Sequence, residues 1–138
     1  MKNALFLFAL ITLSFGSQDT LHAQKTNIWK GGTPGRASDW YCATNWSTGA
    51  VPNEFSNVVI PDVSTTTQAP PTLHAGQVEI KALLLQSGAL LTVGASAELT
   101  IFDSVEGIST ASVCRDGKIH FPGEPAEKKK ADTLLVRN

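Results

Sequence analysis

Six residues between positions 36 and 46 carry the side chains that proteins use to hold sugars. Aromatic rings can stack on the faces of pyranose rings, and planar charged or amide groups beside them can hold the hydroxyls. The six residues are Arg36, Asp39, Trp40, Tyr41, Asn45 and Trp46. Their proximity predicts a carbohydrate-binding surface if the rings are exposed. Burial of the same rings would defeat this hypothesis, because the indoles would then belong to the core.

The carboxylates of the chain do not form an evident catalytic pair. Enzymes that degrade polysaccharides need paired carboxylates, or a base with Arg or Ca²⁺, on one face of the fold. The candidate acids are scattered along the sequence at Asp62, Glu79, Glu98, Asp103 and Glu106. Two of them, Glu79 and Glu98, alternate with apolar neighbours and are expected to face solvent. The sequence therefore predicts a protein that is not an enzyme and that uses no cofactor.

Residues that could ligate a metal also lack the spacing of established sites. Asp103, Glu106 and Asp116 could contribute to a Ca²⁺ site, but the sequence has no D-x-D-x-D-G loop. His74 and His120 each stand alone, without the CxxC or HxxxH spacing that holds zinc. We expect no metal site.

The two cysteines, Cys42 and Cys114, allow one disulfide. An even number of cysteines in an exported protein suggests a bridge, which would close a loop over most of the domain. In the chain-entropy model a loop of that length contributes about 4 kcal/mol. The alternative is two separate buried thiols, and the sequence alone gives no distance between them.

Residues 1–23 have the layout of a secretory signal peptide. Lys2 supplies the positive charge, residues 4–15 form a short apolar run, and Ala23 provides the small residue before the cut. An uncleaved anchor helix is the alternative, but the run falls short of the roughly 18 residues needed to span a bilayer, and no second run approaches that length. We expect an exported protein that is periplasmic, on the cell surface or extracellular, with no membrane span after cleavage.

The rest of the chain favours an all-β fold. The 138 residues include 11 Gly and 7 Pro, with β-branched residues between the turns. Three apolar triplets follow one another at steps of eight residues, at 83–85, 91–93 and 99–101. In each triplet the first and third side chains share one face of a strand. Short, regularly spaced strands predict a β-solenoid of stacked coils, but an antiparallel β-sandwich would produce the same alternation. A net charge of −1 argues against a nucleic-acid partner.

A series of tryptophan motifs resembles the head of secreted or cell-surface parallel β-helix proteins, adhesin-like and common in Bacteroidetes-type bacteria. The matching segments are Trp29-Lys30-Gly31, Asp39-Trp40, Asn45-Trp46-Ser47-Thr48-Gly49-Ala50-Val51-Pro52 and Asn57-Val58-Val59-Ile60-Pro61. Residues 83–93 match the coil pattern of those proteins, and the resemblance extends from residue 28 to about 102. It implies a short right-handed parallel β-helix, with a Trp-rich capping segment at 24–61, a β-coil region at 62–123 and a polar, flexible tail at 124–138.

The open end of a stack of coils must be covered, because an exposed strand edge over an apolar core invites aggregation. The large rings of Trp29, Trp40 and Trp46 are suited to that role. The leading hypothesis is an exported structural or adhesive module, whose partner is a surface polysaccharide or another protein. A carbohydrate-binding module is the second hypothesis, and a fragment of a polysaccharide-degrading β-helix enzyme is the third.

Overall fold

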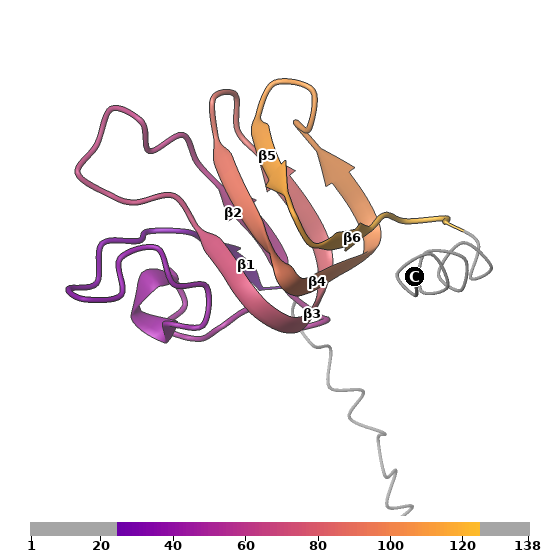
Figure 1. Cartoon of the computed structure of the whole chain (residues 1–138), viewed down its shortest axis with the longest axis horizontal. Coiled ribbons are helices and arrows are strands. Elements are labelled where there is room, and N and C mark those ends of the chain that lie inside the picture. Colours follow the sequence, from indigo (N-terminus) through magenta and orange to yellow (C-terminus); the bar gives the residue numbers. More distant parts are fainter. Residues whose placement is uncertain (1–24, 125–138) are drawn as a thin grey trace, which may run out of the picture.

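The computed structural model describes residues 25–124, which form six strands and one short helical turn (Figure 1). The strands are β1 (Thr26–Ile28), β2 (Asn57–Ile60), β3 (Thr72–Leu85), β4 (Leu90–Glu106), β5 (Ser112–Arg115) and β6 (Lys118–His120), and the turn is the 3₁₀ helix η1 (Ala43–Asn45). The predicted leader, 1–23, and the predicted tail beyond residue 124 lie outside the described residues. Within residues 25–124 no helix is long and apolar enough to cross a membrane.

The strands form one curled parallel sheet with the shape of a half-barrel (Figure 1). The order is β1-β2-β3-β4-β5, and β6 pairs with another part of β4. The all-β prediction is confirmed, whereas the antiparallel sandwich is wrong. Parallel strands normally need a crossover of a dozen or more residues. Here β3 and β4 themselves curve around the sheet, so four residues, 86–89, are enough to connect them.

Residues that pair on neighbouring strands are separated in the sequence by about one turn of the curled chain. Thr72 pairs with Thr92, which pairs with Cys114, at separations of 20 and 22 residues. Val78 pairs with Leu99, which pairs with Ile119, at separations of 21 and 20 residues. The eight-residue step seen in the sequence is therefore not the stacking distance. It is the length of one side of the curve, and it places successive triplets on different sides.

The three apolar triplets nevertheless supply the core. In each of them the first and third side chains are buried, as the alternation predicts, at Leu83, Leu85, Leu91, Val93, Leu99 and Ile101. They pack against inward-facing residues of β2 and β3 and against the three tryptophans. Both long strands carry apolar residues at every second position over much of their length, so one face of the sheet is removed from water.

One glycine marks the corner between two sides of the curve. A Cβ added at Gly94 would lie 2.8 Å from the carbonyl oxygen of His74 in the neighbouring strand. The chain can therefore turn at this point only because position 94 has no side chain.

The segment from Trp29 to Ser56, which we call the head, lies at the β1 side of the sheet (Figure 1). Its backbone joins the sheet directly: the N–H of Trp40 donates to the carbonyl of Thr72 at 3.2 Å, and the N–H of Thr72 donates to the carbonyl of Ser38 at 2.7 Å. The head therefore pairs with the first residue of β3, on the edge opposite to β4.

The two cysteines do not form a disulfide. Cys42 is buried in the head, where its sulfur lies 3.2 Å from the hydroxyl of Thr44, whereas Cys114 is exposed on β5. The structure therefore contains two separate thiols, but the expectation that both would be buried is wrong for Cys114. The reason for the separation is topological, since the head and β5 lie on opposite sides of the two long strands.

Candidate functional site

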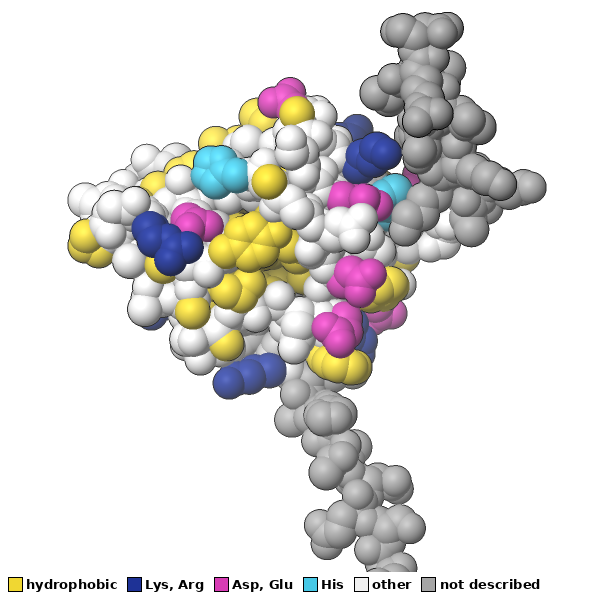
Figure 2. Space-filling view, turned by 60° about the horizontal axis from the view of Figure 1, so that its bottom comes forward, with side chains coloured by type: hydrophobic (Ala, Val, Ile, Leu, Met, Phe, Trp, Pro, Cys, Tyr) yellow, Lys and Arg dark blue, Asp and Glu magenta, His cyan; other side chains and the backbone are white. Residues whose placement is uncertain are grey.

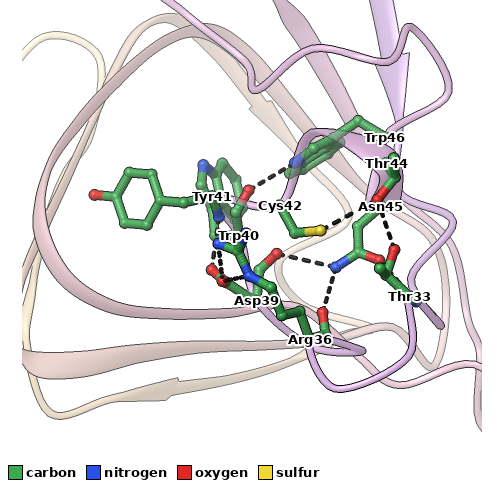
Figure 3. Close-up of polar contacts among 9 residues, drawn as sticks. All are labelled: Thr33, Arg36, Asp39, Trp40, Tyr41, Cys42, Thr44, Asn45 and Trp46. Atoms are coloured by element: carbon green, nitrogen blue, oxygen red, sulfur yellow. Dashed lines mark hydrogen bonds and ion pairs between the residues drawn. The ribbon is translucent and has the colours of Figure 1, made fainter.

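Asn45 is the hydrogen-bonding centre of the head, and its side chain is completely buried. Its amide oxygen accepts from the N–H of Thr33 at 3.0 Å, and its Nδ2 donates to the carbonyls of Arg36 at 2.7 Å and Asp39 at 3.1 Å (Figure 3). These bonds hold the loop between residues 33 and 39 against η1. The prediction that Asn45 contacts a sugar is therefore wrong, because its amide is already occupied and has no access to solvent.

Trp40 and Trp46 are buried as well. The two rings meet edge to face with centroids 4.8 Å apart, and the Nε1–H of Trp46 donates to the carbonyl of Trp40 at 2.8 Å (Figure 3). The ring of Trp29 also meets Trp46 edge to face, with centroids 4.9 Å apart, and its Nε1–H donates to the carbonyl of Ala69 at 2.8 Å. A sugar can reach neither the Trp40 ring nor the Trp46 ring unless the head opens, so their burial contradicts the prediction that they form a stacking surface.

Arg36 and Asp39 remain at the surface as an ion pair. Both Nε and Nη2 of Arg36 donate to Oδ2 of Asp39, at 2.8 and 2.6 Å, while Oδ1 accepts from the N–H of Tyr41 at 2.9 Å. Partial burial acts to raise the pKa of Asp39, but the hydrogen bonds from Arg36 and Tyr41 and the charges of Arg36 and His74 outweigh it and lower the pKa. The hydrogen bond to Asp39 raises the pKa of Arg36. Both groups are therefore charged at neutral pH.

Tyr41 is the exposed aromatic residue of the predicted set. Its ring points away from the buried tryptophans (Figure 3), and 41% of the residue is accessible. The hydroxyl donates to the carbonyl of Ala75 in β3 at 2.8 Å. Partial burial, and to a smaller extent the charge of Asp39, raise the pKa of Tyr41. The phenol therefore stays neutral and is anchored at its far end.

These side chains line an open groove of about 380 Å³ between the head and the start of β3. Half of the predicted sugar-binding residues line it, namely Arg36, Asp39 and Tyr41. Strand β3 contributes His74 and Ala75 to the lining. Sequence reasoning missed His74 as a groove residue, since it lies 33 positions beyond Tyr41 in the chain. No local pattern marks His74 in the sequence, because its place in the groove follows from the path of β3 beside the head.

The candidate acids do not converge on this groove. Asp62 lies in the loop after β2, where it accepts from the N–H of Ser64 at 2.9 Å, and the hydrogen bonds from Ser64 lower its pKa. Glu98 accepts from Gln77 at 3.1 Å and contacts His120 at 2.7 Å. Glu79 is exposed on β3.

Asp103 and Glu106 line a second open depression, of about 400 Å³, over the outer side of β1 to β4. Asp116, the third acid considered for Ca²⁺, is not among the residues that line it. Within the described part of the chain, no group of three His, Cys, Asp or Glu side chains is arranged to hold a metal ion. Figure 2 shows acidic side chains gathered toward one side of the molecule, and hydrophobic ones near the centre of the same face.

Comparison of the chain with protein families, with curated proteins and with solved structures gives no match.

Proposed function

We propose that this chain is an exported, non-enzymatic module of the parallel β-helix type. Its role would be structural or adhesive, at the bacterial cell surface or in the extracellular space. The curled sheet would be a short right-handed β-helix, and the head would be its N-terminal cap. The right hand is the one that nearly all crossovers between parallel strands adopt.

The register between strands is the observation that carries the proposal. Positions 72, 92 and 114 stack in one row, and positions 78, 99 and 119 stack in another. Both rows advance by 20 to 22 residues, which is the behaviour of a chain that winds in coils of nearly constant length. Stacked coils bury a shared core and form a stiff scaffold.

The head has the contacts that a cap requires. It pairs with the edge of β3 through the backbone of Ser38 and Trp40, which satisfies groups that an open edge would leave unpaired. Its three indoles enter the same core as the inward residues of the strands. A cap of this kind protects one end of a coil stack from edge-to-edge association.

Export is the part of the proposal that can be tested first. The full chain, with a C-terminal affinity tag, would be produced in a Gram-negative host, and periplasm, medium and cytoplasm would be analysed separately by intact mass spectrometry. We expect the exported form to begin at Gln24. Recovery of only the full-length chain, in the cytoplasm, would contradict export.

The adhesive, non-enzymatic role is tested with beads coated with residues 24–138. We expect these beads to be retained on surfaces coated with bacterial polysaccharide more strongly than beads coated with heat-unfolded chain. The same preparation should release no reducing ends and no unsaturated uronate from soluble polysaccharides. Release that disappears in Asp103→Asn or Glu106→Gln would overturn the non-enzymatic assignment and favour the enzyme hypothesis.

A further inference from the structure

We propose that the groove between the head and β3 is a binding site for a neutral sugar unit of a polysaccharide. Tyr41 would provide the stacking surface. The Arg36–Asp39 pair from the head and His74 from β3 would hold the hydroxyls. This goes beyond the structural role, because a capped scaffold does not require a groove lined by charged and aromatic side chains.

The ring of Tyr41 is fixed before any ligand arrives. Its hydroxyl is bound to the carbonyl of Ala75, and the backbone at Gly76 makes room for it: a Cβ there would lie 2.7 Å from the hydroxyl oxygen. Gly76 has a φ of +87°, which glycine adopts without strain. An exposed ring anchored at both ends loses little conformational entropy when a ligand stacks on it. Tyr41 is therefore a preorganised platform.

The polar groups beside the ring keep unused hydrogen-bonding capacity. A guanidinium has five N–H donors, and two of those of Arg36 are used by Asp39, which leaves three. Oδ1 of Asp39 accepts one bond, from Tyr41, and retains a second lone pair. The groove thus offers donors and an acceptor side by side. Adjacent hydroxyls of a pyranose, which both donate and accept, match that combination.

The Arg36–Asp39 pair adds no net charge to the groove, which favours a neutral sugar over an acidic one at that wall. The positive charge of Arg36 is already balanced by Asp39 at 2.6 Å. A uronate approaching Arg36 would therefore also face the Asp39 carboxylate, and the repulsion would offset the attraction. The groove, of about 380 Å³, is at the small end of ligand sites and is open to solvent. We expect a dissociation constant on the order of 0.1 to 1 mM per site.

Affinity electrophoresis of residues 24–138 tests the proposal. Native gels would contain β-glucan, galactomannan or arabinoxylan as neutral probes and alginate as the acidic one. We expect at least one neutral polysaccharide to retard the chain. Tyr41→Ala should weaken retardation at least tenfold, whereas Tyr41→Phe, which keeps the ring, should retain most of it. Phe102→Ala removes an aromatic side chain of similar exposure, 53%, from β4 and serves as the matched control.

Each other outcome would overturn the assignment. The groove is not a sugar site if no neutral polysaccharide retards the wild-type chain, or if Tyr41→Ala binds as well as wild type. Retardation by alginate alone would refute the selection for neutral sugars. Thermal unfolding of every variant shows whether it is folded. If Tyr41→Ala is unfolded, Arg36→Ala provides a second test, because it removes donors from the exposed rim and should also weaken retardation.

Discussion

Replacing Asn45 by alanine should destabilise the head more than any comparable surface change. The side chain makes three hydrogen bonds from a fully buried position. Alanine leaves the N–H of Thr33 without its partner, whereas the carbonyls of Arg36 and Asp39 each lose one of two hydrogen bonds, because they also accept from the N–H groups of Asp39 and Cys42. An N–H or carbonyl group left unpaired in the interior costs about 1 to 3 kcal/mol.

The expected loss is about 3 kcal/mol, of which about 2 comes from the unpaired N–H of Thr33 and about 0.5 from each of the two hydrogen bonds lost at carbonyls that keep a backbone partner. In a domain of this size, each kcal/mol lowers the midpoint of thermal unfolding by roughly 4 to 8 °C. Asn45→Ala should therefore unfold at least about 12 °C below wild type.

The assay is thermal and urea-induced unfolding of residues 24–138, followed by far-UV circular dichroism and by tryptophan fluorescence. Asn53→Ala is the matched control. Asn53 also accepts hydrogen bonds, from the N–H of Phe55 and the hydroxyl of Ser56, but its side chain is exposed, so water can replace it. We expect the control to lose about 1 kcal/mol or less.

Asn45→Asp adds a pH test of the same contacts. A carboxylate keeps an acceptor for Thr33 but places negative oxygen against the carbonyls of Arg36 and Asp39. Burial and these carbonyls should raise the pKa of the introduced carboxyl above its unfolded value of about 3.9. The deficit relative to wild type should then be largest at neutral pH and should shrink as the pH falls through the raised pKa. A deficit that does not depend on pH, or a loss below 1 kcal/mol in Asn45→Ala, would refute the reasoning.

Two further predictions concern the thiols and the ion pair. Under native conditions Ellman's reagent should titrate Cys114 quickly and Cys42 only slowly, with both reactive after unfolding; an intact mass 2 Da below that of the reduced chain would contradict free cysteines. The lowered pKa of Asp39 should contribute stability that is present above its unfolded pKa of about 3.9 and lost as the pH falls through the lower, folded value. The thermal midpoint of Asp39→Asn should therefore fall less steeply than that of wild type between about pH 5 and pH 2, and parallel curves would disprove the linkage.

The alternation of apolar residues was enough to predict the inward side chains. Each triplet buries the residues that period-two geometry assigns to one face, such as Leu91 and Val93. The stacking partners were not predictable from the same pattern. Leu91 pairs with Val113 on the next turn of the chain, and that distance depends on where the strands bend. The bends depend on close backbone approaches, such as that of Gly94 to His74, which have no periodic signature.

The candidate site was likewise only partly predictable from the sequence. The side chains between residues 36 and 46 were recognised as a group, but their types do not reveal which of them face solvent. Asn45 and Trp46 become buried because the head folds back on itself and on β3, whereas Tyr41 is directed outward by its bond to Ala75. His74 joins the groove only because β3 passes beside the head.

The sequence by itself determined the β character of residues 25–124 and the side chains that form the core, because both follow from local alternation and turn residues. Only the tertiary structure decided the parallel pairing, the separation of the two thiols and the division of the aromatic cluster into buried tryptophans and an exposed tyrosine. The physical reason is that these features depend on contacts between residues 20 or more positions apart, such as Thr72 with Thr92 and Tyr41 with Ala75. Such contacts are fixed by the path of the whole chain, and no short segment specifies them alone.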